Sequence, residues 1–199
     1  LSGVSITEVM PDPSAVSDSY GEWFEIYNST DTSINIHGWI IKDLDNDYHI
    51  IEGEDLDIMV EPGQYFVLAR NSNEDLNGGI SVGYQYSNFT LSSNDEIILM
   101  DSSGAILDEV HYTNSWAYEG GVSMEVHDPD LDNSIYENWY SSELQYGNGD
   151  YGTPGTDWQN LYVENNIKSF PRSFGLIGAF PNPFNSTTRI VYNISRPGD

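Results

Sequence analysis

The chain has 199 residues, a formal net charge of −26 and a pI near 4.1, so we expect no nucleic-acid partner, because phosphate backbones are repelled. Cysteine is absent, which excludes disulfide scaffolds and thiolate zinc sites, and no apolar run approaches the roughly 20 residues needed to span a bilayer. Aromatic residues make up 13% of the chain, which favours a folded core over a disordered acidic polymer.

The hydrophobic pattern has a period of two along most of the chain, which predicts short strands rather than long amphipathic helices. Strands are predicted, in chain order, at 4–10, 22–28, 34–37, 39–41, 65–69, 97–100, 106–112 and 123–126. The turn sequence Asp101-Ser102-Ser103-Gly104 predicts a hairpin between 97–100 and 106–112. About seven to nine short strands separated by turn residues predict an all-β fold, a β-sandwich.

The composition changes after Gly152-Thr153-Pro154-Gly155, where the regular alternation ends. We therefore expect one domain over 3–156, a linker over 157–178 and a separate segment over 179–199. That last segment carries a Pro-Asn-Pro turn followed by an alternating strand, for which the sequence predicts no partner strand of its own.

Residues 4–155 resemble the lamin tail domain, a module found at the ends of nuclear lamins and in many bacterial secreted proteins. The matching landmarks come in family order: 6–11 (ITEVMP), 22–28 (EWFEIYN), 37–43 (HGWIIKD), 61–63 (EPG), 93–97 (SNDEI), the Gly104/Asp108 hairpin, Trp139 and 152–155 (GTPG). The resemblance implies an immunoglobulin-like β-sandwich that serves as an interaction or spacer module. It also implies that Trp23 and Trp39 belong to the core.

Residues 179–194 are similar to the opening of the C-terminal sorting domain of type IX secretion, with Ser186 in place of the usual proline. This resemblance implies a Gram-negative bacterium of the Bacteroidetes type, contact with the secretion machinery, and a location at the outer-membrane surface or outside the cell. Only the start of that domain is present, so 179–199 is interpreted as a truncated sorting segment. Because Leu1-Ser2-Gly3-Val4 is neither an initiator methionine nor a signal peptide, we expect an excerpt of a longer precursor.

Two acidic loops have the spacing of a calcium site, since alternate carboxylates can converge on one hard cation. The candidate ligands are Asp43, Asp45 and Asp47 in the first loop, and Asp128, Asp130 and Asp132 in the second. The alternative is that each loop is a solvated acidic turn without an ion.

No spacing in the chain is typical of a nucleophile elbow or a zinc hydrolase, so we expect no enzymatic activity. The predicted function is a non-catalytic interaction or spacer module of an exported bacterial protein, whose partner is a surface protein or a glycan. One alternative is a carbohydrate-binding module that uses late aromatic residues such as Trp116 and Trp139, although packing of these rings onto the sheet edge is the favoured interpretation. The other is an accessory domain of an extracellular nuclease or phosphatase whose catalytic part lies elsewhere.

Overall fold

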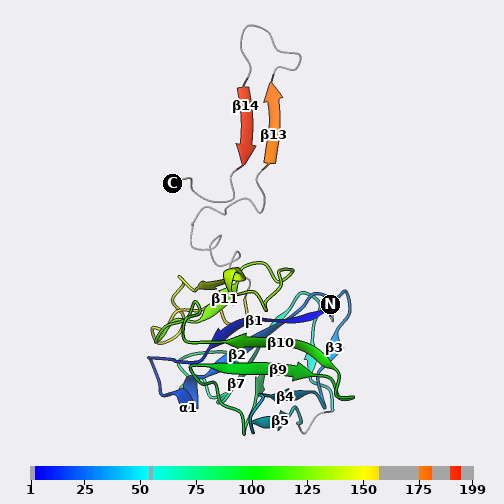
Figure 1. Cartoon of the computed structure of the whole chain (residues 1–199), viewed down its shortest axis with the longest axis vertical. Coiled ribbons are helices and arrows are strands. Elements are labelled where there is room, and N and C mark those ends of the chain that lie inside the picture. The colour runs from blue at the N-terminus through cyan, green and yellow to red at the C-terminus, as the bar shows by residue number, and fades with distance from the viewer. Residues whose placement is uncertain (1–2, 54–55, 157–174, 181–188, 194–199) are drawn as a thin grey trace. The chain divides into compact units, whose positions relative to one another are not determined.

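The computed structural model describes residues 3–53, 56–156, 175–180 and 189–193, and divides the chain into the compact units Leu1–Asp157 and Trp158–Asp199 (Figure 1). Most of the segment predicted as a linker, 157–174, lies outside the described residues. The same holds for 181–188, which contain the whole Pro181-Asn182-Pro183 turn.

The first unit is a sandwich of a six-stranded and a four-stranded sheet. The first sheet has the order β12 (Trp139–Ser141), β11 (Met124–Val126), β1 (Val4–Met10), β2 (Trp23–Asn28), β7 (Tyr65–Ala69), β8 (Tyr84–Gln85). The second has the order β10 (Ile106–Tyr112), β9 (Asp95–Met100), β4 (Ile40–Lys42), β5 (Tyr48–Ile50). A small ribbon pairs β3 (Ile34–Asn35) with β6 (Met59–Val60), and the short helical turns are α1 (Asp18–Gly21) and η1 (Tyr136–Asn138).

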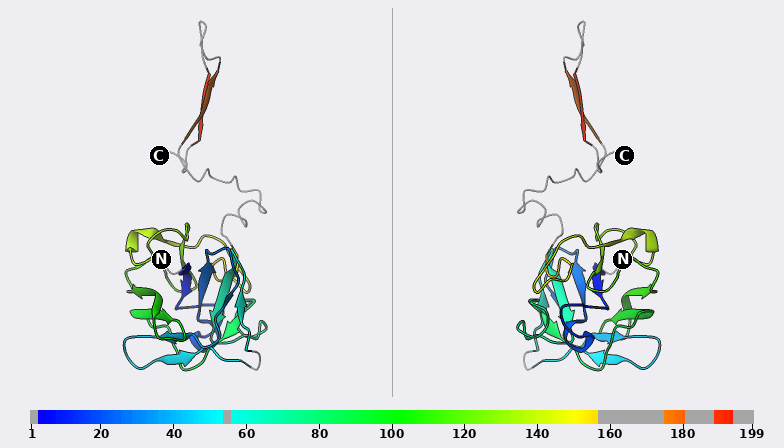
Figure 2. Two further views of the ribbon diagram at one scale, coloured as in Figure 1. Left: turned by 90° about the vertical axis from the view of Figure 1, so that its right-hand side faces the viewer. Right: turned by 90° about the vertical axis from the view of Figure 1, so that its left-hand side faces the viewer.

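The sheets face each other across one apolar core (Figures 1 and 2). Ile6, Phe24 and Ile26 from the first sheet are fully buried against side chains such as Ile41 and Leu99 from the second. The prediction of an all-β, immunoglobulin-like β-sandwich is therefore confirmed. The strands in the two sheets outnumber the seven to nine expected, because pieces as short as β8 show no periodicity in the sequence.

The outer face of the six-stranded sheet is buried as well, which simple alternation did not predict. Trp23 packs there with Met10 and Val67, and the ring of Tyr146 from the C-terminal loops lies nearly perpendicular to the Trp23 ring. The Trp23 indole N–H donates to the Tyr146 hydroxyl at 3.1 Å. Trp23 is thus a core residue, as expected, in a second apolar cluster on the far side of the sheet.

The hairpin predicted around Asp101–Gly104 is confirmed as β9 and β10. One carboxylate oxygen of Asp101 accepts hydrogen bonds from the amides of Ser103 and Ala105, which closes the turn. Gly104 has φ +87°, a conformation that favours glycine because it has no Cβ. The turn is therefore determined by local sequence.

In the second unit, β13 (Gly175–Phe180) pairs antiparallel with β14 (Arg189–Asn193). The prediction that the C-terminal strand has no partner is wrong, because β13 begins inside the segment interpreted as a linker and supplies the missing hydrogen bonds. No helix within the described ranges is long and apolar enough to cross a membrane.

Candidate functional site

A groove of about 350 Å³ runs beside the first half of β10 and is the candidate interaction site. Its walls come from three places: the start of β1 with Ser29, the stretch 106–109 of β10, and the loop 129–134. The volume lies at the lower end of the range of about 300–1,000 Å³ that is usual for ligand sites. Two large apolar side chains stay open to solvent here, Ile106 at 57% exposure and Leu131 at 40%.

The floor of the groove is fixed by Asp108, which joins the two sheets at this corner. Its Oδ2 accepts a hydrogen bond from the backbone N–H of Ile6 at 2.6 Å and another from the Asn133 side-chain amide at 2.7 Å. The same Asn133 amide donates to the carbonyl of Ile6. Burial raises the pKa of Asp108, because desolvation outweighs the hydrogen bonds that favour its charged form.

We expect Asp108→Ala to lower the free energy of unfolding by about 2–4 kcal/mol, because it leaves two donors without an acceptor. Asp108→Asn keeps an acceptor oxygen and should cost clearly less. Urea denaturation of the two variants and the wild type measures both effects. Equal losses in the two variants would contradict this account of the corner.

The second acidic loop forms one wall of this groove, but its carboxylates do not converge. Asp128 accepts a hydrogen bond from the backbone N–H of Asp130, and Asp132 accepts two from Ser134, through the amide and the hydroxyl. The Ser134 hydroxyl and amide hold the pKa of Asp132 below its ordinary value. The loop is thus shaped by local turns in which aspartate oxygens bind backbone amides.

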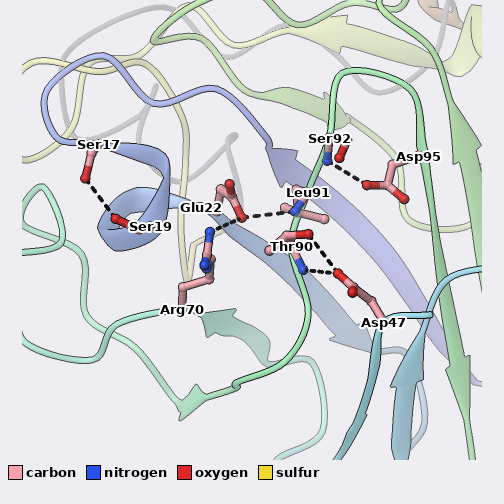
Figure 3. Close-up of polar contacts among 9 residues, drawn as sticks. All are labelled: Ser17, Ser19, Glu22, Asp47, Arg70, Thr90, Leu91, Ser92 and Asp95. Carbon is pink, nitrogen blue, oxygen red and sulfur yellow. Dashed lines mark hydrogen bonds and ion pairs between the residues drawn. The ribbon is translucent and has the colours of Figure 1, made fainter. Parts of the chain in front are cut away.

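The first acidic loop is organised in the same way. Asp43 Oδ1 accepts hydrogen bonds from the backbone amides of Asp45 and Asp47. Asp47 turns to the neighbouring loop, where its Oδ2 accepts from the amide and the hydroxyl of Thr90 at 2.8 and 2.7 Å (Figure 3). Throughout the described part of the chain, no three aspartate, glutamate or histidine side chains are grouped so as to hold a metal ion.

Calcium binding by either loop stays a prediction. If a loop rearranges to bind Ca²⁺, excess calcium should raise the melting temperature by mass action. At a hundredfold excess over Kd, binding should add about 2.7 kcal/mol to the free energy of unfolding. Thermal melts in CaCl₂ and in NaCl of matched ionic strength measure this. Equal melting temperatures, or a calcium shift that persists in the Asp45→Ala/Asp130→Ala double variant, would contradict it.

Sequence reasoning missed a row of buried carboxyls on the outer face of the six-stranded sheet. The register pairs Glu8 with Glu125 on one side and with Glu25 on the other. The loop segment 152–155 lies over them: the Thr153 amide donates to Glu8 at 2.9 Å and the Gly155 amide to Glu25 at 2.6 Å. The three glutamates are therefore structural groups that fasten this segment to the sheet.

The close packing of these carboxyls favours an extra proton in the row. The Thr153 hydroxyl lies 3.1 Å from Glu8 Oε2 and 2.7 Å from Glu125 Oε2, yet it has a single hydrogen to donate. A proton on either carboxyl lets the Thr153 hydroxyl accept one of these hydrogen bonds and donate the other. In agreement, burial and then the neighbouring charges of Glu125 and Glu25 raise the pKa of Glu8 well above its usual range.

A fourth buried carboxyl, Glu22, sits where α1 leads into β2. It accepts a hydrogen bond from the Leu91 amide at 3.0 Å and lies 3.2 Å from an Arg70 guanidinium nitrogen (Figure 3). Desolvation outweighs both contacts and raises the pKa of Glu22 to about 7. Glu22 thus links the start of β2 with Arg70, which follows β7, and with the loop before β9.

The late aromatic residues pack mainly onto the protein itself. Trp139 is 4% exposed and donates its indole N–H to the carbonyl of Asn133 at 2.8 Å. Trp116 lies 5.9 Å from the Trp139 ring, and the Tyr118 hydroxyl donates to the carbonyl of Ser93. This packing leaves Trp139 no open face for a sugar.

The chain matches the model of one protein family. The model of the Lamin Tail Domain matches residues 1–114, which is more than half of the chain. A comparison with curated proteins finds no match. The matched region contains the β1 and β10 walls of the groove, while the loop 129–134 lies beyond it.

Proposed function

The chain belongs to the lamin tail domain family, and from this premise we propose that it is a non-catalytic interaction module of a protein exported to a bacterial cell surface or to the medium. The observation that carries the proposal is the groove beside β10, where the large apolar side chains of Ile106 and Leu131 are open to solvent. Exposed apolar side chains gathered in a concave site are typical of surfaces that bind a partner.

Export is supported by the sequence after the sandwich. The motif around Pro181-Asn182-Pro183 is similar to the start of a type IX sorting domain. The strongly acidic composition is also compatible with an exported protein. We therefore propose that the segment from residue 179 onward targets the protein to the type IX secretion machinery, and that the sandwich is the part displayed outside the cell.

An antibody raised against the sandwich tests this in the cells that produce the protein. We expect protease added to intact cells to remove the antigen, or the antigen to be found in the medium. Changing Pro181, Asn182 and Pro183 together to alanine should trap the protein inside the cell, while the matched change of Asn165, Asn166 and Ile167 should leave export intact. Export of both variants alike, or a wild-type protein confined to the cytoplasm, would overturn the proposal.

A further inference from the structure

We propose that the groove beside β10 binds an extended, cationic segment of a partner polypeptide, laid along the outer edge of this strand. This inference rests on the proposed function as an interaction module and names the class of partner. Three independent features of the groove carry it: an open strand edge, an apolar floor and an acidic rim.

The first feature is the strand edge. β10 is the outermost strand of the four-stranded sheet, so its outer row of backbone N–H and C=O groups has no strand of its own sheet beside it. The nearest strand of the other sheet, β1, gives the N–H of Ile6 to the Asp108 side chain instead of to the β10 backbone. The residues of β10 in the groove, 106–109, span about 13 Å at 3.3 Å per residue, enough to pair with a short extended peptide.

The second feature is the floor. Ile106 and Leu131 are exposed, and Val4, Leu107 and Pro129 complete an apolar lining between them. Alternate side chains of an extended peptide point to the same side, so every second residue of a bound segment can enter this lining. The floor therefore favours a peptide whose alternate residues are apolar.

The third feature is charge. The lining contains the exposed carboxyls of Glu109, Asp130 and Asp132, and it contains no lysine, arginine or histidine. Only two of the six basic residues of the chain, Lys42 and Arg70, precede residue 157, and neither belongs to the lining. Outside the lining, His111 Nε2 lies 3.5 Å from Glu109 Oε2. An occupant with lysine or arginine supplies the counter-charges that the lining itself lacks, and complementary charge also speeds association and rejects acidic competitors.

The experiment uses the full chain and a fluorescent decapeptide that alternates lysine and valine. Fluorescence anisotropy should detect binding at low NaCl that weakens at high NaCl, because exposed charges are screened by salt. A glutamate–valine decapeptide should not bind, and a lysine–glycine decapeptide should bind more weakly, since it lacks the apolar residues.

Variants then locate the site. Glu109→Gln with Asp130→Asn should weaken binding of the lysine–valine peptide roughly two- to thirtyfold, which is the range for two exposed charge pairs. The matched control, Glu74→Gln with Asp75→Asn, removes the same charge from exposed positions outside the groove and should leave the affinity unchanged. Ile106→Ser with Leu131→Ser should weaken binding without reducing its salt dependence.

Two results would overturn the inference. The first is no binding of the lysine–valine peptide at low salt. The second is an equal loss of affinity in the groove variant and its control, which would show diffuse attraction to an acidic surface. Neither result affects the export assay, so failure of this inference is distinguishable from failure of the proposed function.

Discussion

Replacing Trp139 by alanine is expected to lower the free energy of unfolding by about 3–5 kcal/mol, the range for a large buried aromatic side chain. Trp139 is 4% exposed and belongs to the main core. Its indole also holds the carbonyl of Asn133, the residue that binds Asp108 at the groove. The substitution should therefore loosen the groove wall as well as the core, and urea denaturation measures the loss.

The matched control for Trp139 is Tyr136→Ala. Tyr136 is 49% exposed and touches Trp116 with a ring-centroid distance of 5.9 Å. Its removal should cost no more than about 1.5 kcal/mol, the upper value for an aromatic pair. Comparable losses at the two positions would contradict the assignment of Trp139 to the core.

The second large effect is a fall in stability as the pH rises above about 4.5, the ordinary pKa of a glutamate. The pKa of Glu8 is raised in the folded protein, so the folded state holds a proton that the unfolded state releases near pH 4.5. The stabilisation is complete below that pH and is lost as the pH climbs through the folded-state pKa. Glu22 acts in the same direction between about 4.5 and about 7.

Glu8→Gln isolates this effect, because glutamine resembles the protonated carboxyl but cannot ionise. As the pH rises above about 4.5, we expect the wild type to lose stability faster than Glu8→Gln, because all the other carboxyls titrate in both proteins. The exposed control Glu74→Gln should follow the wild type. Parallel stability profiles for the wild type and Glu8→Gln would refute a proton held at this position.

The elements that the sequence predicted well are those determined by neighbouring residues. The β9–β10 hairpin is an example, since alternating apolar residues flank a turn whose Asp101 and Gly104 form it locally. The buried glutamates were not predictable in this way. Alternation places Glu8 on the outer face, which is normally solvated, and its cover comes from irregular loop residues near 153 that show no periodic pattern.

An irregularity in β1 also makes the facing of its residues hard to predict from the sequence. A register shift between Ile6 and Glu8 in the pairing of β1 with β2 interrupts the simple alternation. Thr7 and Glu8 both reach groups on the outer face, Thr7 at Glu25 and Glu8 at Thr153, while Ile6 and Val9 face the core. A strict period of two cannot reproduce this arrangement, so the sequence located the strand but not the side that each residue faces.

The acidic loops show a second limit of prediction from sequence. Aspartates at alternate positions suit both a calcium site and a turn in which each carboxylate binds the amide two residues later. In the structure, Asp43 and Asp128 make the second kind of contact. Spacing alone does not separate the two, because the same short side chains and the same backbone curvature serve both.

The position of β1 has a consequence for synthesis. This first strand lies inside its sheet, where Val9 pairs with Met124, and Glu8 receives the amide of Thr153 from 145 residues further along the chain. A growing chain that has not reached residue 124 leaves one edge of β1 unpaired. The hydrogen bond from the Thr153 amide to Glu8 forms only once residue 153 has been made. Contacts so distant in sequence slow folding to about milliseconds or longer. The sandwich therefore closes only after nearly its whole length has been made.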